Sequence, residues 1–272
     1  MRGIVSTYTL PPLTNSNITT NRITRYFRIS RISAHTLVGV MTVSLVFPLA
    51  NKSLKLWLIK WWCKRLLAAF NLRVTSHGHI PNQNGAMSNS MIIANHISWT
   101  DIHALNSIVP LRFIAKSEIS SWPVFGYLAR KSNALFIDRG KRQDAARIID
   151  ITSRSLMQGD NLCIFPEGTT TDGTTMMPFK SSIVQAAIQA NATIHPVAIR
   201  YPGHNGSANT SMAYAGETTM KESMQQILLQ KNPVVELHFL APIDTAGLSE
   251  NAKDRRKLTL QIEHLIKQKL SF

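Results

Sequence analysis

The chain has 272 residues, which suits one large domain, or one domain with an appended segment, at roughly 150 residues per domain. Hydrophobic residues make up 44% and charged residues 17% of the sequence, which excludes both a disordered polar chain and a protein built mainly of membrane-spanning helices. The 30 Lys and Arg against 15 Asp and Glu give a net charge of +15, which predicts an anionic partner, either nucleic acid or an acidic membrane surface.

The first 70 residues differ in composition from the rest of the chain. Residues 1–32 are rich in Asn, Thr and Ser and carry several arginines, which predicts a basic, loosely ordered arm. Residues 34–50 are almost uncharged, at the short end of what spans a hydrocarbon core of about 30 Å. Residues 54–70 place Leu and Trp at helical spacing with Lys and Arg between them, which is typical of a helix at a membrane interface.

Basic residues flank the apolar stretch on both sides, so the preference of positive charge for the cytoplasmic side gives no orientation. We therefore expect residues 33–70 to form a membrane-associated helical hairpin with both ends on the cytoplasmic face of the inner (plasma) membrane. A single transmembrane span and a pair of ordinary core helices are the alternatives.

From residue 71 onward, short apolar runs alternate with segments of helical length. Strands are predicted over 91–94, 111–115, 134–137, 162–165, 194–200 and 234–240, and helices over 101–108, 122–131, 142–158, 179–190 and 250–269. This alternation implies crossover connections and a mostly parallel sheet flanked by helices. We therefore predict an α/β domain over 71–272, with a surface loop at 202–220.

A histidine and an aspartate lie five residues apart after the first of these strands. His96 comes at the carboxyl end of the strand, where open α/β folds bind their ligands. Residues five apart on one helix point about 140° apart, so His96 and Asp101 can meet only if the histidine lies in the turn before the helix. An aspartate bound to one imidazole nitrogen leaves the other nitrogen to act as a base. A histidine that only hydrogen-bonds its own loop is the alternative.

Other polar groups follow neighbouring strands. In Phe165-Pro166-Glu167-Gly168-Thr169-Thr170-Thr171, the glycine permits an unusual turn, and hydroxyl and N–H groups can line a polar or anionic ligand. A plain turn from strand to loop is the alternative. Lys116 and Arg139 follow the strands at 111–115 and 134–137. A base, an acid, two cations and a hydroxyl-rich turn are thus expected at one edge of the sheet.

These motifs resemble those of the glycerolipid acyltransferase family, of the lysophosphatidic acid acyltransferase type, over residues 72–245. Asn95-His96 with Asp101 resembles the catalytic H-x4-D motif of the family. Lys116-Ser117-Glu118 with Phe136-Ile137-Asp138-Arg139, then Phe165-Pro166-Glu167-Gly168-Thr169, then His195-Pro196-Val197 resemble the three blocks that follow it. The resemblance implies a glycerol-3-phosphate acyltransferase-like fold with a membrane-embedded helical motif at the amino terminus.

The resemblance also implies the reaction. A fatty acyl group would pass from acyl-CoA or acyl-ACP to the free hydroxyl of a lysolipid, without an acyl-enzyme. His96 would take the hydroxyl proton, and Asp101 would orient the imidazole and stabilise its charged form. The residues expected to bind or shape the substrate are Lys116, Arg139, Glu167, Gly168, Thr169, Thr170 and Lys180. Neither a cofactor nor a metal is implied.

One position departs from the common pattern of the family. Thr170 stands where many members acting on phosphate-bearing acceptors have an arginine, so a forked cation suited to phosphate is missing. The segments 169–173 and 177–182 resemble the branch that includes lyso-ornithine lipid acyltransferases, although Lys180 or Arg139 could supply the charge. We expect 1-acyl-glycerol-3-phosphate as the acceptor, with lyso-ornithine lipid as the alternative.

A basic membrane-tethering or nucleic-acid-binding protein is the alternative from another class. The net charge of +15 is compatible with it. Against it, the basic residues are dispersed along the sequence, and no nucleic-acid-binding motif is present. Membrane lipids and the acyl donor are therefore the expected partners.

Overall fold

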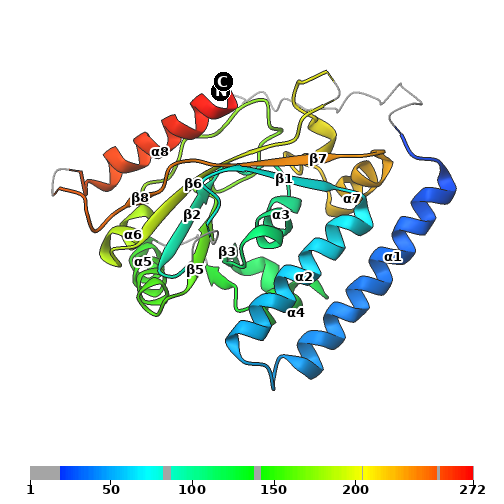
Figure 1. The fold of residues 1–272 in the computed structure, drawn as a ribbon, viewed down its shortest axis with the longest axis horizontal. Helices are drawn as coiled ribbons and strands as arrows, with labels where there is room; N and C mark the ends of the chain where they lie inside the picture. The colour runs from blue at the N-terminus through cyan, green and yellow to red at the C-terminus, as the bar shows by residue number, and fades with distance from the viewer. Residues whose placement is uncertain (1–18, 82–86, 138–141, 204, 250–251, 272) are drawn as a thin grey trace, which may run out of the picture.

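A computed structural model of the chain describes residues 19–81, 87–137, 142–203, 205–249 and 252–271 (Figure 1). In this part of the chain, eight strands form one sheet in the order β1-β7-β6-β2-β5-β3-β4, with β8 paired to β6. The strands are β1 (Arg73–Gly78), β2 (Ser90–Ala94), β3 (Arg112–Lys116), β4 (Leu135–Ile137), β5 (Asn161–Ile164), β6 (Thr193–Arg200), β7 (Val234–Phe239) and β8 (Ile243–Asp244). The pairs that β6 forms with β7 and β8 are antiparallel and the others are parallel, as expected for a mostly parallel sheet.

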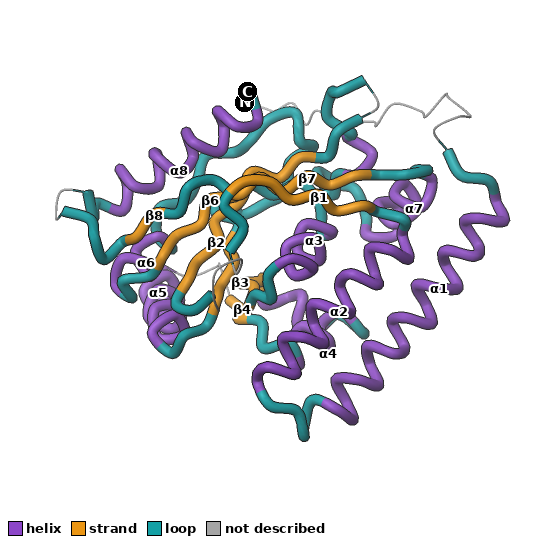
Figure 2. The backbone as a smooth tube through the Cα atoms, viewed as in Figure 1, coloured by secondary structure: helices purple, strands orange, loops and turns teal. Residues whose placement is uncertain are grey.

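Helices cover both faces of this sheet (Figure 2). They are α1 (Arg22–Met41), α2 (Lys52–Phe70), α3 (Thr100–Ile108), α4 (Phe125–Lys131), α5 (Arg142–Met157), α6 (Val184–Gln189), α7 (Met220–Leu229) and α8 (Arg255–Leu270). A π-helical turn, Thr42–Val46, continues α1, and short 3-10 turns lie at Ser117–Ser121 and Thr210–Met212.

The central strand β2 shows how the two layers share the core. Its residues alternate between the faces of the sheet, as the two-residue period of a strand requires. Ile92 and Ala94 are fully buried in the cluster that holds α2, α3 and α7. Met91 and Ile93 are fully buried in the opposite cluster, which holds α6 and α8. The domain is therefore a three-layer α/β structure, with β2 at its centre.

The amino-terminal helices form a hairpin that begins earlier than the sequence predicts. The side chain of Asn21 caps α1 by accepting a hydrogen bond from the backbone N–H of Thr24 at 2.8 Å. Residues 22–32 are therefore helical, and the prediction of a loosely ordered arm was wrong for them; residues 1–18 lie outside the described part of the chain. The tertiary reason is Arg28, which is buried and donates hydrogen bonds to the carbonyls of Gln230 and Lys231, just after α7.

The two helices of the hairpin pack closely. A Cβ atom on Gly39 would lie 2.4 Å from Nε1 of Trp62, so the absence of a side chain at this position allows the contact. The rings of His35 and Trp62 stack with centroids 5.3 Å apart, and Nε2 of His35 lies 2.9 Å from the Trp62 carbonyl oxygen. Leu66, Leu67 and other residues of α2 are buried in the main core. The hairpin is thus joined to the α/β domain rather than tethered beside it.

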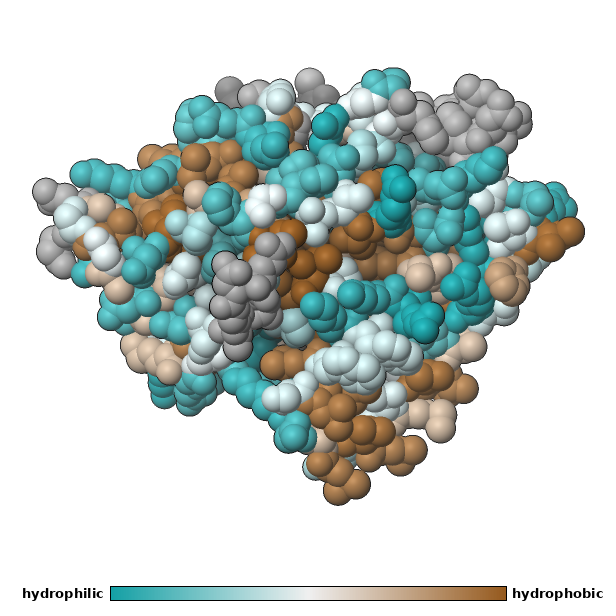
Figure 3. Space-filling model, viewed as in Figure 1, coloured by the Kyte–Doolittle hydropathy of each residue, from teal (hydrophilic) through white to brown (hydrophobic). Residues whose placement is uncertain are grey.

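The hairpin is most apolar around its turn, where hydrophobic residues gather at the lower tip of the molecule in Figure 3. Among the described residues, one helix, Arg22–Val46, is long and apolar enough to cross a bilayer, and 17% of its apolar window is buried within the protein. The large hydrophobic residues exposed around the hairpin turn are Leu37, Val38, Met41, Leu45, Val46, Leu49, Leu54 and Trp57. Such a contiguous exposed apolar surface is typical of a membrane-docking element.

Several elements differ from the sequence prediction. The polar strand β1 and the helix α7 were not predicted, whereas β2, β3, β5 and β6 lie within one residue of their predicted starts. The helix predicted over 179–190 begins only at Val184. The backbone N–H of Phe179 donates instead to Glu263 of α8 at 2.8 Å, and residues 181–183 form a turn before the helix.

Candidate active site

The site begins where β2 separates from β6. The side chain of Asn95 accepts a hydrogen bond from the N–H of Ile199 at 2.7 Å and donates one to its carbonyl at 3.0 Å. This amide takes the place of the backbone ladder between the two strands. The chain can therefore leave the sheet at His96 without losing buried hydrogen bonds.

His96 and Asp101 meet as the sequence predicts. His96 lies in the turn before α3 and Asp101 in its first turn, with Nδ1 of the histidine 2.8 Å from Oδ2 of the aspartate. The same oxygen accepts hydrogen bonds from the N–H groups of Ile97 at 2.8 Å and Ser98 at 2.9 Å. Asp101 is fully buried, so these donors stabilise its carboxylate and fix its orientation.

A residue that the sequence analysis missed completes this network. The hydroxyl of Tyr201 donates to Oδ1 of Asp101 at 2.5 Å, and it lies 2.7 Å from the hydroxyl of Thr100. Burial, followed by the charge of Asp101, raises the pKa of Tyr201 well above its usual value, so the phenol keeps its proton. Tyr201 directly follows β6, so its position at a strand end was the available signal.

The imidazole of His96 is held on its face as well as at its edge. The ring of Phe165 stacks on it with centroids 3.8 Å apart and an interplanar angle of 7°. The side chain of His96 keeps a relative exposure of 17%, and Nε2 has no hydrogen-bond partner within the described part of the chain. With Nδ1 committed to Asp101, Nε2 is free to accept a proton from a bound substrate.

Glu167 supports the backbone of the site. One carboxylate oxygen accepts a hydrogen bond from the N–H of His96 at 2.6 Å, and the other accepts from the N–H of Met177 at 2.7 Å. Burial raises the pKa of Glu167 to about 7, and these two N–H groups oppose the shift. Glu167 therefore shapes the site by fixing the turn that carries His96.

The hydroxyl-rich turn after β5 wraps around the histidine. The N–H of Thr171 donates to the carbonyl of His96 at 2.9 Å, and the hydroxyl of Thr170 donates to the carbonyl of Tyr214. Gly168 adopts a positive φ of 77°, a conformation that favours glycine. The Thr170 hydroxyl is therefore used within the protein, whereas Thr169 is exposed.

The structure describes the three predicted cationic residues to different extents. Lys116 is the last residue of β3, and only its backbone is described. Arg139 lies outside the described residues. Lys180 is exposed, and its N–H donates to the carbonyl of Pro166 at 3.0 Å, which places it beside the turn after β5. The roles of these three residues, and of Thr169 and Thr170, in substrate binding remain predictions.

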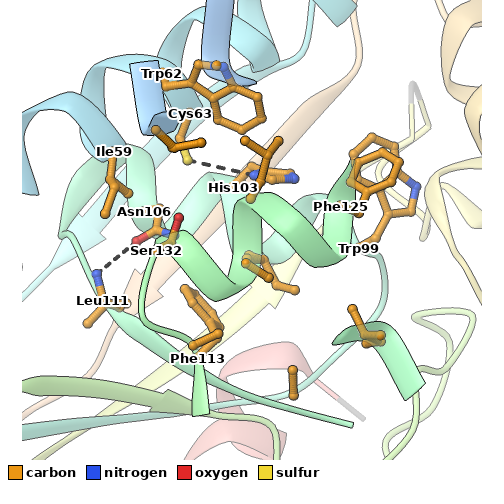
Figure 4. A pocket seen from close by; sticks show the side chains of 18 of the residues that line it. Ile59, Trp62, Cys63, Trp99, His103, Asn106, Leu111, Phe113, Phe125 and Ser132 are labelled. Atoms are coloured by element: carbon orange, nitrogen blue, oxygen red, sulfur yellow. Dashed lines mark hydrogen bonds between the residues drawn. The ribbon is translucent and has the colours of Figure 1, made fainter. Parts of the chain in front are cut away.

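A cavity of about 210 Å³ lies next to the site, between the hairpin and α3, β3 and α4 (Figure 4). Phe47, Ile59 and Trp62 of the hairpin and Trp99 and Phe113 of the domain are among its lining residues. The Phe113 ring stacks on Phe165 at 6.1 Å, and Phe165 stacks on His96. Two stacked rings, those of Phe113 and Phe165, therefore lie between the cavity and His96.

The polar groups in the cavity wall are neutral or already paired. Burial lowers the pKa of His103 to about 4, and Nδ1 of His103 lies 3.7 Å from Sγ of Cys63. The side-chain oxygen of Asn106 accepts a hydrogen bond from the N–H of Leu111 at 2.8 Å. The cavity thus suits an uncharged apolar chain rather than a polar ligand.

Comparison with known proteins gives consistent results. Residues 71–200 match a family profile described as Acyltransferase. The chain is 34% identical over 210 residues to the lyso-ornithine lipid O-acyltransferase of Pseudomonas aeruginosa, which covers 77% of each chain. It is 34% identical over 177 residues to the 1-acyl-sn-glycerol-3-phosphate acyltransferase of Neisseria gonorrhoeae, covering 65% of this chain and 68% of that one.

A solved structure shares the fold. The 1-acyl-sn-glycerophosphate (LPA) acyltransferase PlsC from Thermotoga maritima superimposes with a TM-score of 0.68 at 21% identity, over 92% of this chain and 95% of that one. The superposition therefore includes much of the amino-terminal hairpin as well as the α/β domain. The predicted architecture, a mostly parallel sheet preceded by an apolar helical element, is confirmed.

Proposed function

The chain belongs to the acyltransferase family, and from that premise we propose that it transfers a fatty acyl group from a thioester to the free hydroxyl of a lysolipid at a membrane surface. The observation that carries this proposal is the pair formed by His96 and Asp101, with Nδ1 and Oδ2 at 2.8 Å and Nε2 open. Such a pair is the minimum that base-assisted attack by a hydroxyl requires.

The reaction follows from this arrangement. Nε2 of His96 takes the proton of the lysolipid hydroxyl while the hydroxyl oxygen attacks the thioester carbonyl carbon. The new ester bond forms, the carbon–sulfur bond breaks, and the departing thiolate takes the proton from the imidazolium. Asp101, held by Tyr201 and two backbone N–H groups, stabilises the imidazolium between these steps.

The apolar cavity lined by Phe113 supports the proposed substrate class. Its wall is built jointly by the hairpin and the α/β domain, so an acyl chain in it would contact both. Neutral His103 and paired Asn106 leave no charge that would oppose an apolar chain. We infer that this cavity holds an acyl chain of one of the two substrates, with its reacting end near His96.

The positive charge of the chain supports a proposal for the acyl donor and for the side of the membrane on which the protein lies. The net charge of +15 is complementary to the phosphates of coenzyme A and to the acidic surface of acyl carrier proteins. Basic residues on both sides of the apolar tip favour a hairpin that docks from the cytoplasmic face of the inner (plasma) membrane. Either acyl-CoA or acyl-ACP can therefore serve as donor.

We propose two acceptors. The first is 1-acyl-glycerol-3-phosphate, on which the relative from Neisseria gonorrhoeae acts by name. The second is lyso-ornithine lipid, the acceptor in the name of the relative from Pseudomonas aeruginosa. The second is favoured by one observation: Thr170 is neutral, and its hydroxyl is already bonded to the Tyr214 carbonyl, so this position cannot contribute a phosphate-binding cation.

The test is to assay purified full-length protein with both lysolipids, each with acyl-CoA and acyl-ACP. Wild type, His96→Ala and Thr170→Arg are compared by kcat/KM. We expect His96→Ala to lose transfer to every acceptor and Thr170→Arg to shift the preference toward the phosphate-bearing lysolipid. No transfer by the wild type to any lysolipid would contradict the proposed function. A strong wild-type preference for 1-acyl-glycerol-3-phosphate, unaltered in Thr170→Arg, would remove Thr170 from the argument about the acceptor.

A further inference from the structure

A second concave surface lies between α1 and α7, away from the catalytic histidine. This groove has a volume of about 440 Å³ and is lined by Arg22, Arg25, Tyr26, Ile29, Gln225, Leu228 and Leu229. None of these residues lines the apolar cavity next to His96. The groove thus presents two guanidinium groups, a phenol and an amide together with three aliphatic side chains.

The two arginines of the groove are not neutralised within the protein. Among the described residues, neither Arg22 nor Arg25 forms an ion pair with a carboxylate. Nε of Arg25 is buried and has no hydrogen-bond partner. A guanidinium N–H that is removed from water without a partner is costly, because a buried donor loses its hydration. An anion cannot reach this buried N–H, but Arg22 is exposed and Arg25 is half-buried, so their remaining guanidinium N–H groups provide donors for an anion in the groove.

The groove adjoins the membrane-docking surface. Ile23, Tyr26, Leu37 and Met41 are exposed and, at about 100° per residue, lie within one outward stripe of α1. By the same 100° spacing, Tyr26 lies at the edge of this stripe. Arg25 lies close to the face of α1 that packs on the domain. A lipid whose chains contact the stripe can therefore place its headgroup in the groove.

From this continuity we propose that the groove between α1 and α7 binds the phosphate of an anionic bilayer phospholipid, separately from the substrates. Arg22 and Arg25 donate to the phosphate oxygens, and forked guanidinium groups suit this geometry. Ile29, Leu228 and Leu229 contact the adjoining acyl chains. Only an amphiphile satisfies both halves of the groove, which is why a lipid fits better than free phosphate.

The bound lipid would orient the hairpin on the membrane. Arg28, one turn after Arg25, donates to the carbonyls of Gln230 and Lys231 at the end of α7. A phosphate held by Arg25 next to this anchor fixes α1, α7 and one lipid relative to one another. The lipid site and the anchor together then set the angle at which the α/β domain meets the bilayer.

The test compares three full-length variants that each lower the net charge by one. Arg25→Gln removes a donor from the groove, and Gln225→Glu places a carboxylate opposite the arginines at an exposed position where folding is not at risk. Arg31→Gln is the control, because Arg31 is exposed on the opposite flank of α1, next to the carbonyl of Ala68. Binding is measured by co-sedimentation with phosphatidylcholine vesicles with and without phosphatidylglycerol, at low and high salt.

We expect Arg25→Gln and Gln225→Glu to weaken binding to phosphatidylglycerol vesicles by about tenfold or more, as for loss of a hydrogen bond to a charged group. Arg31→Gln should cost at most about fivefold, the effect of one basic residue near an anionic surface. At high salt the effect of Arg31→Gln should disappear, because diffuse attraction is screened, whereas the effects of the other two variants should persist.

Equal losses in the three variants that vanish together at high salt would overturn the proposal, because they would indicate diffuse attraction without a site. Unchanged binding in Arg25→Gln and Gln225→Glu would overturn it too. Displacement of the protein from vesicles by millimolar glycerol phosphate would assign the groove to a soluble phosphate instead of a lipid. Vesicle binding is independent of acyl transfer, so these outcomes are separate from the test of the catalytic function.

Discussion

Tyr201→Phe tests whether the buried phenol tunes the catalytic pair or only fills space. The substitution removes one hydroxyl that donates to Oδ1 of Asp101 at 2.5 Å and leaves the ring in the core. The three donors on Oδ2, from His96, Ile97 and Ser98, remain. The aspartate should therefore keep its orientation but lose part of the stabilisation of its charge.

The magnitude follows from these contacts. A hydrogen bond to a charged group contributes about 1.5–3 kcal/mol, and its loss leaves a buried carboxylate oxygen unpaired. With roughly 2–4 °C of Tm per kcal/mol in a domain of this size, Tm should fall by about 3–12 °C. Because Asp101 stays oriented, kcat/KM should fall by only about tenfold, less than the 10²–10⁴-fold effect of losing a general base.

The activity separates the two roles of Tyr201. If the phenol supports the carboxylate of Asp101, kcat/KM should fall in Tyr201→Phe even at temperatures well below its Tm, where the variant is fully folded. Tyr214→Phe is the matched control, because the Tyr214 hydroxyl has no hydrogen bond to the described residues. Thermal melts and acyl-transfer assays well below Tm give both readouts. A destabilised Tyr201→Phe enzyme with wild-type kcat/KM would refute the reasoning, since Tyr201 would then act only in packing.

Three further predictions follow from the site and the hairpin. His96→Ala should lower kcat by about 10²–10⁴-fold with unchanged vesicle binding, and near-normal turnover would exclude His96 as the base. Glu167→Gln presents an amide donor to a backbone N–H and should cost about 1–3 kcal/mol in the free energy of unfolding. Burial raises the Glu167 pKa from 4.5 to about 7, so this carboxyl stabilises the wild type progressively as pH falls from 7 toward 4.5. The Tm difference between wild type and Glu167→Gln should therefore widen over that range. A constant Tm difference would contradict the assignment. Leu45→Glu with Leu49→Glu should release the protein from vesicles, whereas Leu260→Glu on α8, equally apolar and exposed, should not.

The part of the site that could be predicted from sequence is the part encoded locally. Asn95, His96 and Asp101 lie within one strand-to-helix turn, so the strand end and the five-residue spacing were enough to bring the pair together. The contact between Tyr201 and Asp101 joins residues 100 positions apart, and its geometry depends on the pairing of β2 with β6. No local pattern encodes that pairing, so Tyr201 remained unrecognised.

The same difference between local and long-range signals explains which elements of the fold could be predicted from the sequence. The strands at the centre of the sheet are apolar runs, whereas β1 carries the polar sequence RVTSHG and is a strand because it pairs with β7 at the edge. The arginine-rich segment from residue 22 reads as a solvated arm by composition. It is helical because Arg28 finds carbonyl partners beyond α7, a contact made only in the folded chain. Tertiary hydrogen bonds thus override composition at both places.

The hairpin that we propose docks on the membrane and the proposed catalytic site share one core in this protein. Leu66, Leu67 and Phe70 of the hairpin are buried in the core that also holds Ala94, the residue before the Asn95-His96 turn. Removing the hairpin would expose this core and open the cavity next to His96, so a truncated enzyme would lose activity for reasons unrelated to membrane binding. Point substitutions on the exposed tip separate the two properties, because they alter the contact with the bilayer and leave the shared core intact. If such an enzyme binds vesicles poorly but acylates detergent-dispersed lysolipid normally, docking supplies the substrate. If vesicle binding and acylation of detergent-dispersed lysolipid fall together, the bilayer contact also sets the geometry of the active site.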